Sequence, residues 1–407
     1  MLRRTFLSSI PAVALYAGPT RITRIRVAPA QGHFHKFVAM NAYDKVPKGE
    51  TYEHALIRIE TNRGVEGIGA GTYSQPDEAF YNALKSLIGE DPLELLQIAN
   101  GRASGPSAKL QPVLAAYPHL DIALFDLAGK LLNKPVWQLI GEEVHARVPA
   151  YDGTLYFSDV LHEDKGVSAV VKECKEAARA GYPAVKLKLG RNFKWMPGAV
   201  GRERDIEVVH AVRHALGADI RIMTDANNGY KDHFDEAWNL LEKTSQDNVY
   251  WIEELFPESV AGYSRLKDKI AASGMKTLNA DGENFSKPVQ FDEYLRPRRL
   301  IDVLQLDARR GGFFGNMQVA RLGEPAGAVT IPHNWASQIG VFVALHLSKV
   351  VKSIPMAEDD RSKLDAIVAT GYEFAGGSYK VSDEPGLGIR IDPKVYAAQS
   401  EPKERVV

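Results

Sequence analysis

The stretch SAVVKECKEAARAGYPAVKLKLG (residues 168–190) decides the fold class, because it joins an amphipathic helix pattern directly to a short apolar strand pattern. The same alternation of strand and helix runs from residue 147 to residue 370, with about eight strand–helix units. This pattern predicts a parallel α/β barrel. A doubly wound open sheet is the alternative, but no glycine-rich phosphate-binding motif follows the early strand patterns.

The segments on either side of the barrel pattern are organised differently. Residues 21–146 begin with strand patterns and then switch to helical periodicity, which predicts an α+β domain. Residues 371–407 are rich in glycine and turn-forming residues, and we expect them to pack back on this first domain.

Residues 1–20 resemble a twin-arginine export leader, with Arg3 and Arg4 ahead of an apolar stretch. That stretch is short, however, and a strand pattern follows almost at once. We favour export to the periplasm, with a cytoplasmic protein that carries an N-terminal extension as the alternative. Whether the leader is cleaved is left open.

The composition excludes several classes of protein. The formal net charge is -1 and 25% of the residues are charged, so there is no electrostatic reason to expect nucleic acid or an anionic membrane as partner. After the leader, no run is long and apolar enough to span a bilayer. Cys174 is the single cysteine, which rules out an internal disulfide and a cysteine-based metal cluster. A small molecule is therefore the expected partner.

Chemically functional residues end successive strand patterns at intervals of about one strand–helix unit. The carboxyl ends of barrel strands face one shared mouth, so these residues should meet there. Alone, each has an ordinary explanation, since an Asp at a strand end is commonly a helix N-cap. Because all of them occupy the same position at the end of successive strands, a shared functional site is the better interpretation. The residues are Lys186 and Lys188, Asp225 and Asn227, Glu253 and Glu254, Asp281 and Glu283, Asp307, His333, and Glu358.

Asp225, Glu253 and Glu283 would repel one another on adjacent strands unless a cation lay between them. An all-oxygen set of ligands indicates a hard divalent ion, with Mg²⁺ preferred and Mn²⁺ possible. Lys188, beside a second ammonium and a dication, should have a depressed pKa and act as a base. Lys186 should stay charged and bind the substrate carboxylate.

Across the mouth, His333 and Asp307 are expected to form a dyad. A carboxylate bonded to one ring nitrogen fixes the tautomer and leaves the other nitrogen free to exchange a proton. Glu358 could donate a hydrogen bond to a developing oxyanion if it were protonated.

Seven motifs, in this order, resemble those of the mandelate racemase group of the enolase superfamily. The resemblance covers nearly all of the chain beyond the leader. Two departures blur the ligand positions by one or two residues: Leu255-Phe256-Pro257 follows the Glu pair where the family usually has Pro at once, and Asp281 stands beside Glu283. The motifs are DIALFDLAGKLLNKPVWQLIG, VKLKLG, TDANNGY, YWIEEL, DGENF, LDARRGG and IPHNW.

The resemblance implies a (β/α)7β modified TIM barrel with an N-terminal α+β capping domain, and a homo-oligomer. It also implies magnesium as cofactor, with the first Glu of the pair as the ligand, and removal of the proton α to a carboxylate. The roles carried over match those above: Asp225, Glu253 and Glu283 hold the metal, Lys188 and His333 are the acid/base pair, Asp307 orients His333, and Glu358 completes the oxyanion site.

Dehydration of an acid sugar to a 2-keto-3-deoxy acid is the favoured reaction, because it is the commonest outcome for this set of residues in the family. A racemase or epimerase using the same Lys188/His333 pair is the alternative. The muconate-cycloisomerase and dipeptide-epimerase branch expects a lysine on the sixth strand, and LQLDARRGG has none. A degenerate barrel acting as a binding protein is the non-enzyme alternative.

Candidate specificity residues lie in the expected capping loops and near the strand ends. His33 and Tyr43 suit a polyhydroxy or dicarboxylic acid, although their segment could equally be a solvent-facing loop. Asn227 is a further candidate. Arg309 and Arg310 could hold a distal carboxylate, with at least one of them expected in a structural ion pair.

Overall fold

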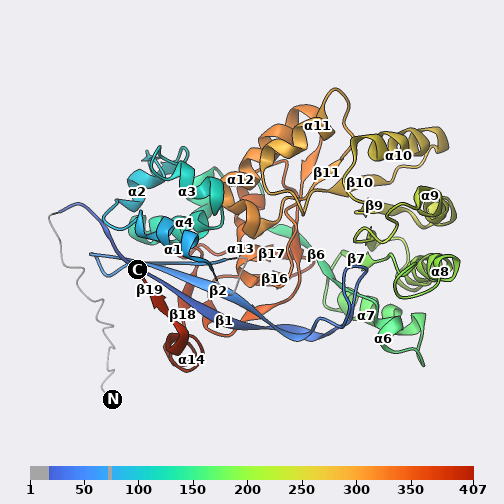
Figure 1. Cartoon of the computed structure of the whole chain (residues 1–407), viewed down its shortest axis with the longest axis horizontal. Coiled ribbons are helices and arrows are strands. Elements are labelled where there is room, and N and C mark those ends of the chain that lie inside the picture. The colour runs from blue at the N-terminus through green and yellow to red at the C-terminus, as the bar shows by residue number, and fades with distance from the viewer. Residues whose placement is uncertain (1–17, 72–75) are drawn as a thin grey trace, which may run out of the picture.

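The computed structural model describes residues 18–71 and 76–407, and Figure 1 shows an N-terminal cap lying beside a larger barrel. The predicted leader therefore lies almost entirely outside the described residues. In the cap, three antiparallel strands in the order β1-β2-β3 pack against the longest of its helices. The cap elements are β1 (Ile22–Val38), β2 (Gly49–Thr61), β3 (Glu66–Ala70), α1 (Glu78–Lys85), α2 (Pro92–Leu95), β4 (Ile98–Ala99), β5 (Arg102–Ala103), α3 (Gln111–Ala116), α4 (Leu120–Leu132) and α5 (Val136–Ile140).

The barrel consists of parallel strands that run in order from β6 to β12, and β13 pairs in parallel with β6. The predicted (β/α)7β barrel with an α+β cap is thus confirmed. Its elements are β6 (Val148–Leu155), α6 (Ser158–Leu161), α7 (Val167–Arg179), β7 (Ala184–Lys188), α8 (Gly198–Leu216), β8 (Arg221–Asp225), α9 (Phe234–Lys243), η1 (Ser245–Asp247), β9 (Val249–Glu253), α10 (Val260–Ser273), β10 (Leu278–Asp281), η2 (Pro288–Phe291), α11 (Asp292–Leu295), β11 (Val303–Leu304), α12 (Ala308–Gly323), η3 (Glu324–Ala326), β12 (Val329–Thr330), α13 (Gln338–Val350) and β13 (Ala357–Asp359).

After β13 the chain returns to the cap. Strand β14 pairs with β1, although its residues fall inside the segment that the sequence assigned to the barrel. Of the C-terminal segment, β19 pairs with β1, whereas β17 extends the barrel sheet at β6. These elements are β14 (Lys363–Leu364), β15 (Ile367–Ala369), β16 (Glu373–Ala375), β17 (Ser378–Lys380), β18 (Ile389–Ile391), α14 (Pro393–Gln399), η4 (Glu401–Lys403) and β19 (Arg405–Val406).

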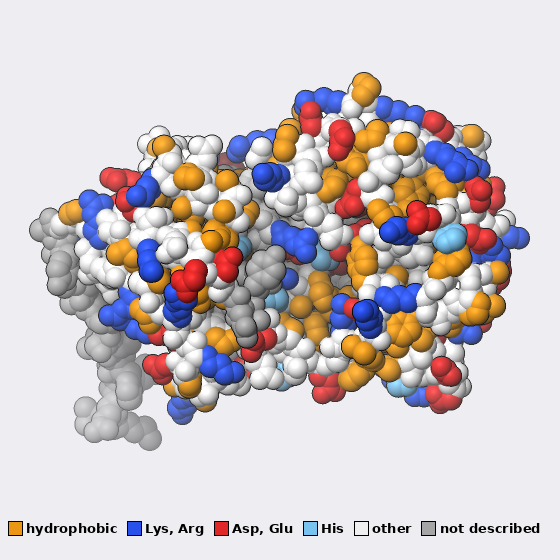
Figure 2. All heavy atoms as spheres, viewed as in Figure 1, with side chains coloured by type: hydrophobic (Ala, Val, Ile, Leu, Met, Phe, Trp, Pro, Cys, Tyr) orange, Lys and Arg blue, Asp and Glu red, His pale blue; other side chains and the backbone are white. Residues whose placement is uncertain are grey.

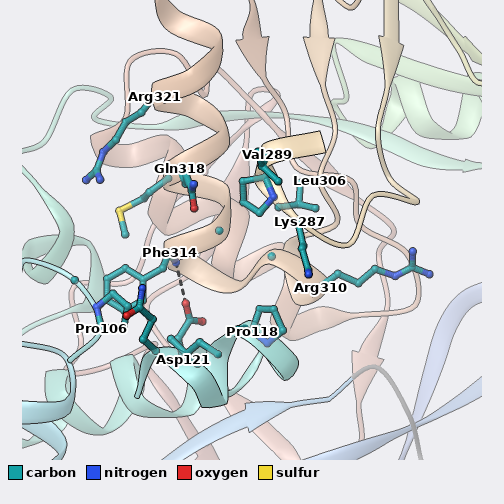
Figure 3. Close-up of a pocket in the computed structure, with 18 of the residues that line it drawn as sticks. Pro106, Pro118, Asp121, Lys287, Val289, Leu306, Arg310, Phe314, Gln318 and Arg321 are labelled. Atoms are coloured by element: carbon teal, nitrogen blue, oxygen red, sulfur yellow. Dashed lines mark hydrogen bonds between the residues drawn. The ribbon is translucent and has the colours of Figure 1, made fainter. Parts of the chain in front are cut away.

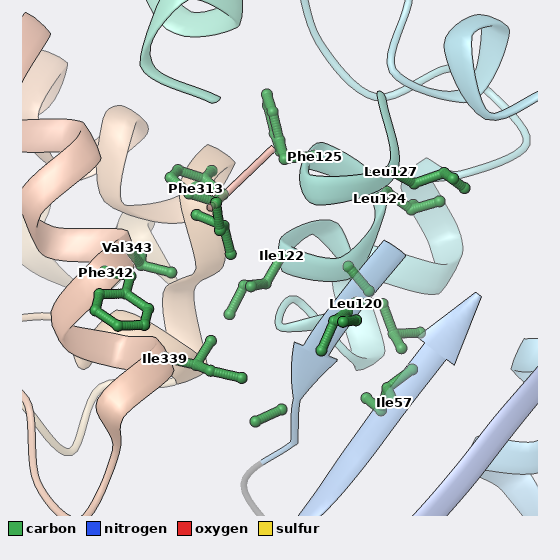
Figure 4. Close-up of a cluster of buried hydrophobic side chains, with 14 of the residues drawn as sticks. Ile57, Leu120, Ile122, Leu124, Phe125, Leu127, Phe313, Ile339, Phe342 and Val343 are labelled. Carbon is green, nitrogen blue, oxygen red and sulfur yellow. The ribbon is translucent and has the colours of Figure 1, made fainter. Parts of the chain in front are cut away.

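Helix α4 joins the two parts of the molecule because it is apolar around most of its circumference, as expected of a helix buried on every side. In Figure 4, Phe125 faces Phe313 of α12, and Leu120 lies near Ile57 of β2. The rings of Phe125 and Phe313 have centroids 4.9 Å apart. Strand β3 approaches α4 so closely that a Cβ on Gly67 would lie 2.2 Å from a backbone oxygen of α4, which requires glycine there.

Alternation along β7 explains how two lysines enter the barrel. Val185 and Leu187 pack outward among the helices, so Ala184, Lys186 and Lys188 all face the interior at successive levels. Ala184 belongs to an apolar layer that fills the end of the barrel below the lysines. Among the described residues, no helix is both long and apolar enough to cross a membrane.

Candidate active site

Lys186 is fully buried and forms ion pairs with two carboxylates from other strands. Its Nζ lies 2.9 Å from Glu253 Oε1 and 2.8 Å from Glu358 Oε1, with Asp225 Oδ2 at 3.8 Å. Burial lowers the pKa of Lys186, but these carboxylates outweigh that effect and hold the pKa well above its ordinary value. The charge was predicted correctly. In this structure the ammonium is enclosed by protein carboxylates, and its contact with a substrate carboxylate stays a prediction.

Lys188 lies one level nearer the mouth and forms an ion pair with Asp225. Burial opposes its charge, but the Asp225 carboxylate raises its pKa above the ordinary value. The sequence predicted a depressed pKa, on the assumption of a dication beside the amine. In this structure the nearest charge is the carboxylate instead. The Lys188 ammonium also lies over the ring of Tyr156, 5.3 Å from its centroid.

The predicted ligands Asp225, Glu253 and Glu283 converge, with one oxygen of each within 4.8 Å of the others. Glu254 and Asp281 belong instead to a neighbouring acidic group with Glu258. The sequence analysis preferred Glu253 to Glu254 and Glu283 to Asp281 as metal ligands. The structure brings these preferred residues together with Asp225.

The chemistry of this cluster fits a hard divalent cation. Glu283 Oε2 is buried and accepts no hydrogen bond from the described residues. Burial, together with the nearby Asp225, raises the pKa of Glu253 to about 8, although Lys186 acts in the opposite direction. A bound dication would relieve this mutual repulsion, and Asp225, Glu253 and Glu283 would hold it.

His333 and Asp307 form the predicted pair at the ends of β12 and β11. His333 Nδ1 lies 2.9 Å from Asp307 Oδ2, and His333 Nε2 faces Glu283 Oε2 at 3.2 Å. Burial lowers the pKa of His333, but the surrounding carboxylates, Glu283 first, raise it to about 9. Burial also acts to raise the pKa of Asp307, yet its hydrogen bond with His333 holds that pKa below the ordinary value.

Glu358 accepts rather than donates. Its Oε2 accepts a hydrogen bond from the Asn334 backbone N–H at 3.0 Å, and its Oε1 pairs with Lys186. Both oxygens thus act as acceptors here, and the expected donation to a substrate oxyanion stays a prediction. Gly153 on β6 makes room for the carboxylate, because a Cβ there would lie 2.4 Å from Glu358 Oε1.

Two of the predicted specificity residues serve other contacts. His33 is half exposed and pairs with Asp365 at 2.6 Å, and its contact with substrate stays a prediction. Arg309 is buried between cap and barrel, where its guanidinium lies 2.9 Å from His54 Nε2 and donates to the Trp335 carbonyl. It is a structural link rather than a group free to hold a carboxylate.

The other two, Asn227 and Tyr43, meet through Glu254. Asn227 Nδ2 donates to Glu254 Oε2 at 2.9 Å, and Tyr43 Oη donates to Glu254 Oε1 at 3.0 Å. Arg310 remains exposed and donates to the Glu283 carbonyl at 3.2 Å.

The sequence analysis missed Gln305 and Trp335. Gln305 Nε2 donates to Glu253 Oε2 at 3.0 Å, and its position directly after β11, two residues before Asp307, was a usable signal. Trp335 stacks on Phe34 of the cap, with centroids 4.8 Å apart, and no periodic signal marks it. In the centre of Figure 2, histidine side chains are visible in the hollow between cap and barrel.

A separate cavity of about 510 Å³ lies between the loop before α3 and the first turns of α12 (Figure 3). Asp121 of α4 lies in its wall and accepts hydrogen bonds from the backbone N–H groups of Phe313 and Phe314, at 3.0 and 2.8 Å. It thereby caps the part of α12 that follows Gly312, whose φ of 58° interrupts the helix. None of the three candidate metal ligands lines this cavity.

Comparison with known proteins places the chain in a family. Residues 169–395 match the enolase C-terminal domain-like family, and residues 46–141 match the N-terminal domain of the mandelate racemase / muconate lactonizing enzyme family. The chain therefore belongs to the mandelate racemase / muconate lactonizing enzyme family of the enolase superfamily, and it is an enzyme of that superfamily.

Its relatives carry out different reactions. D-galactarolactone cycloisomerase of Agrobacterium fabrum is 29% identical over 356 residues, which cover 83% of this chain and 89% of that protein. Arabinonate dehydratase of Saccharolobus solfataricus is 27% identical over 354 residues, covering 84% and 90%. N-succinyl-L-Arg/Lys racemase of Bacillus cereus is 25% identical, so the family alone does not fix the reaction.

Two solved structures are similar over nearly the whole chain. Galacturonate dehydratase from a Geobacillus species, complexed with D-galacturonate and 5-keto-4-deoxy-D-galacturonate, has a TM-score of 0.81 and 27% identity, covering 95% of this chain and 98% of that one. A mandelate racemase/muconate lactonizing protein from Geobacillus sp. Y412MC10, complexed with magnesium and tartrate, has a TM-score of 0.80 and 28% identity, covering 93% and 95%.

Proposed function

We propose that this protein is a magnesium-dependent dehydratase of an acid sugar, which it converts to a 2-keto-3-deoxy acid. One observation carries the proposal: Lys188 and His333 come from non-adjacent strands, β7 and β12, and touch different members of the same carboxylate cluster. A substrate carboxylate placed at that cluster would lie between a potential base and a potential acid. Several relatives are dehydratases of acid sugars, which supports this reaction over the others.

The metal ligands are Asp225, Glu253 and Glu283, and Mn²⁺ is the alternative to Mg²⁺. When bound, the ion would supply positive charge that stabilises the developing negative charge of the substrate and offsets the carboxylate that raises the pKa of Lys188. Lys186 remains a fixed cation behind Glu253 and Glu358, where it limits repulsion within the cluster.

Lys188 Nζ removes the proton on the carbon next to the substrate carboxylate. The C–H bond breaks, and its electron pair moves into the bond between that carbon and the β-carbon as the β C–O bond breaks. His333, whose protonated ring is supported by Asp307, gives its Nε2 proton to the departing hydroxyl, which leaves as water. The enol that remains tautomerises to the 2-keto-3-deoxy acid.

Asp307 holds the imidazole of His333 in one orientation. Its Oδ2 accepts from Nδ1, while its Oδ1 is fixed by the backbone N–H groups of Arg309 and Arg310, both at 2.9 Å. These two backbone contacts hold the carboxylate in place. This anchoring aims Nε2 at the carboxylate cluster.

Proton NMR in D₂O tests the proposal, with Mg²⁺ and a panel of aldonic, aldaric and uronic acids. We expect one acid to lose its α-proton signal and yield a 2-keto-3-deoxy product, and EDTA should stop the reaction. Lys188→Ala should abolish the reaction, whereas Lys172→Ala, at an exposed lysine on α7, should not. Deuterium exchange without elimination would indicate the racemase or epimerase alternative, and no exchange with any acid would contradict the proposal.

A further inference from the structure

Each strand that supplies a candidate metal ligand also supplies a second polar side chain just beyond it. Asn227 follows Asp225 by two residues, while Glu254 and Asn284 directly follow Glu253 and Glu283. These three side chains meet at Glu254, because Asn227 Nδ2 donates to its Oε2 at 2.9 Å and Asn284 Nδ2 donates to its Oε1 at 2.6 Å. We call Asn227, Glu254 and Asn284 the outer ring.

A loop of the cap (residues 39–48) binds this outer ring directly. Tyr43 Oη donates to Glu254 Oε1 at 3.0 Å, and Asn41 Nδ2 donates to Asn227 Oδ1 at 2.8 Å. Both oxygens of Glu254 therefore accept hydrogen bonds. Oε2 accepts from Asn227 of the outer ring, and Oε1 accepts both from Asn284 of the outer ring and from Tyr43 of the cap loop. The barrel segment after β7 supports the same loop, since Trp195 Nε1 donates to the Asn41 carbonyl at 2.8 Å.

Placing a glutamate at position 254 is energetically unfavourable for the folded protein. It is 1% exposed, and the hydrogen bonds that its carboxylate accepts from the described residues come from the neutral side chains of Tyr43, Asn227 and Asn284. Its backbone is also left-handed, with φ of 45°, which is a strained conformation for a residue other than glycine. A buried carboxylate in a strained conformation is retained when surrounding contacts hold it, and here the cap loop provides one of them.

We propose that Glu254 couples docking of the cap loop to the geometry of the metal ligands. Glu253 and Glu254 are adjacent in the chain, so movement of the outer ring is transmitted to a ligand through one peptide bond. Binding of the metal then favours the docked loop, and the docked loop strengthens metal binding by the same factor. Glu254 and Tyr43 are positioning residues in this scheme, which rests on the metal site of the proposed function but not on the reaction.

Limited proteolysis with Mg²⁺ alone tests this coupling on the full chain. Lys45 lies exposed in the cap loop and offers a trypsin site, and mass spectrometry identifies the cut. We expect Mg²⁺ to slow cleavage after Lys45 in the parent protein. In Tyr43→Phe and Glu254→Gln this protection should be lost, and calorimetry should show Mg²⁺ binding weakened by about 5-fold or more.

Tyr396→Phe is the matched control, since Tyr396 also donates to a glutamate, Glu404, but lies in the C-terminal helix away from the metal ligands. It should keep full protection and full Mg²⁺ affinity. Unchanged melting temperatures would show that the Tyr43 and Glu254 variants are folded. A steady-state comparison should show Tyr43→Phe raising the magnesium concentration needed for half-maximal rate more than it lowers the limiting rate.

The proposal is overturned if Mg²⁺ does not protect the parent loop, or if both variants are protected as well as the parent. Neither result depends on turnover. Loss of Mg²⁺ protection in the variants of a protein that dehydrates no acid would therefore support the coupling while the proposed function failed. An active Tyr43→Phe enzyme with parental Mg²⁺ affinity and protection would contradict the coupling and leave the proposed function intact.

Discussion

His333 Nδ1 and Asp307 Oδ2 lie 2.9 Å apart, which ties the imidazole of one strand to a carboxylate that caps the helix following another. Asp307→Asn should keep the size of this group but remove the charge that supports the imidazolium. We expect the turnover number to fall by at least about 100-fold, as for loss of general acid catalysis. The pH profile should also shift to lower pH. NMR assays of product formation at several pH values would measure both, and an unchanged profile would contradict the assigned role.

The raised pKa of His333 predicts how stability depends on pH. Burial acts to lower this pKa, but neighbouring carboxylates raise it from about 6.5 to about 9 in the folded protein. The contribution to stability should therefore be fully present below pH 6.5 and be lost as the pH rises through about 9. The melting temperatures of the parent and His333→Asn, measured in EDTA, should converge over this interval. A melting-temperature difference that stays constant from pH 6 to pH 10 would contradict this contribution of His333 to stability.

Lys186→Met should destabilise the protein severely. The substitution keeps an unbranched chain of similar length but leaves Glu253 and Glu358 buried without their cation. Breaking a buried ion pair by removing one partner costs about 3–5 kcal/mol. Urea unfolding would measure this loss. Lys130→Met, at a lysine that pairs with a buried Asp126 from a more exposed position, is the comparison and should lose less.

Gly153→Ala should disturb the site through a single methyl group. The new Cβ would lie 2.4 Å from Glu358 Oε1, so the carboxylate must move away from Lys186. We expect activity to fall at least about 10-fold and stability to fall by about 1–3 kcal/mol, as for overpacking. Gly315→Ala in α12 is the control, because its nearest neighbour would be 3.5 Å away and alanine favours helix. Similar effects at both positions would argue against a specific clash.

The regular spacing of polar residues at the ends of successive strands predicted much of the site. In a barrel of alternating strands and helices, the strand ends form a ring, so residues spaced in this way meet at one mouth. Asp225, Glu253 and Glu283 could be placed together from spacing and resemblance alone, and so could His333 with Asp307. Contacts across the domain boundary could not. Arg309 meets His54, 255 residues away in the chain, and His33 meets Asp365, 332 residues away. Local spacing carries no information about such pairs.

The cap was harder to predict than the barrel for a related reason. Its sheet recruits β14 and β19 from the far end of the chain, and each pairs with β1 over two residues. Such short pairings leave little periodic signal in the sequence. The ion pairs of Lys186 with Glu253 and Glu358 could not be predicted, because alternation shows that a side chain faces inward but not how deeply it lies.

Asp121→Ala tests how firmly the cap holds the barrel. The Asp121 carboxylate accepts hydrogen bonds from the backbone N–H groups of Phe313 and Phe314, so a residue of α4 caps a helix of the other domain. Alanine would leave the buried Phe313 N–H and the partly buried Phe314 N–H without their acceptor, and we expect a loss of about 2–4 kcal/mol in the free energy of unfolding. Urea denaturation would measure it.

Asp77→Ala provides the matched comparison, since Asp77 caps the exposed helix α1 by accepting from the Phe80 N–H at 2.9 Å. There, water can replace the lost acceptor, so the loss should stay near 1 kcal/mol. The Asp121 variant should also separate the unfolding of cap and barrel into two transitions, because it removes a link between them. A single transition with a loss no larger than that of Asp77→Ala would show that apolar packing around Phe125 and Phe313 alone holds the domains together.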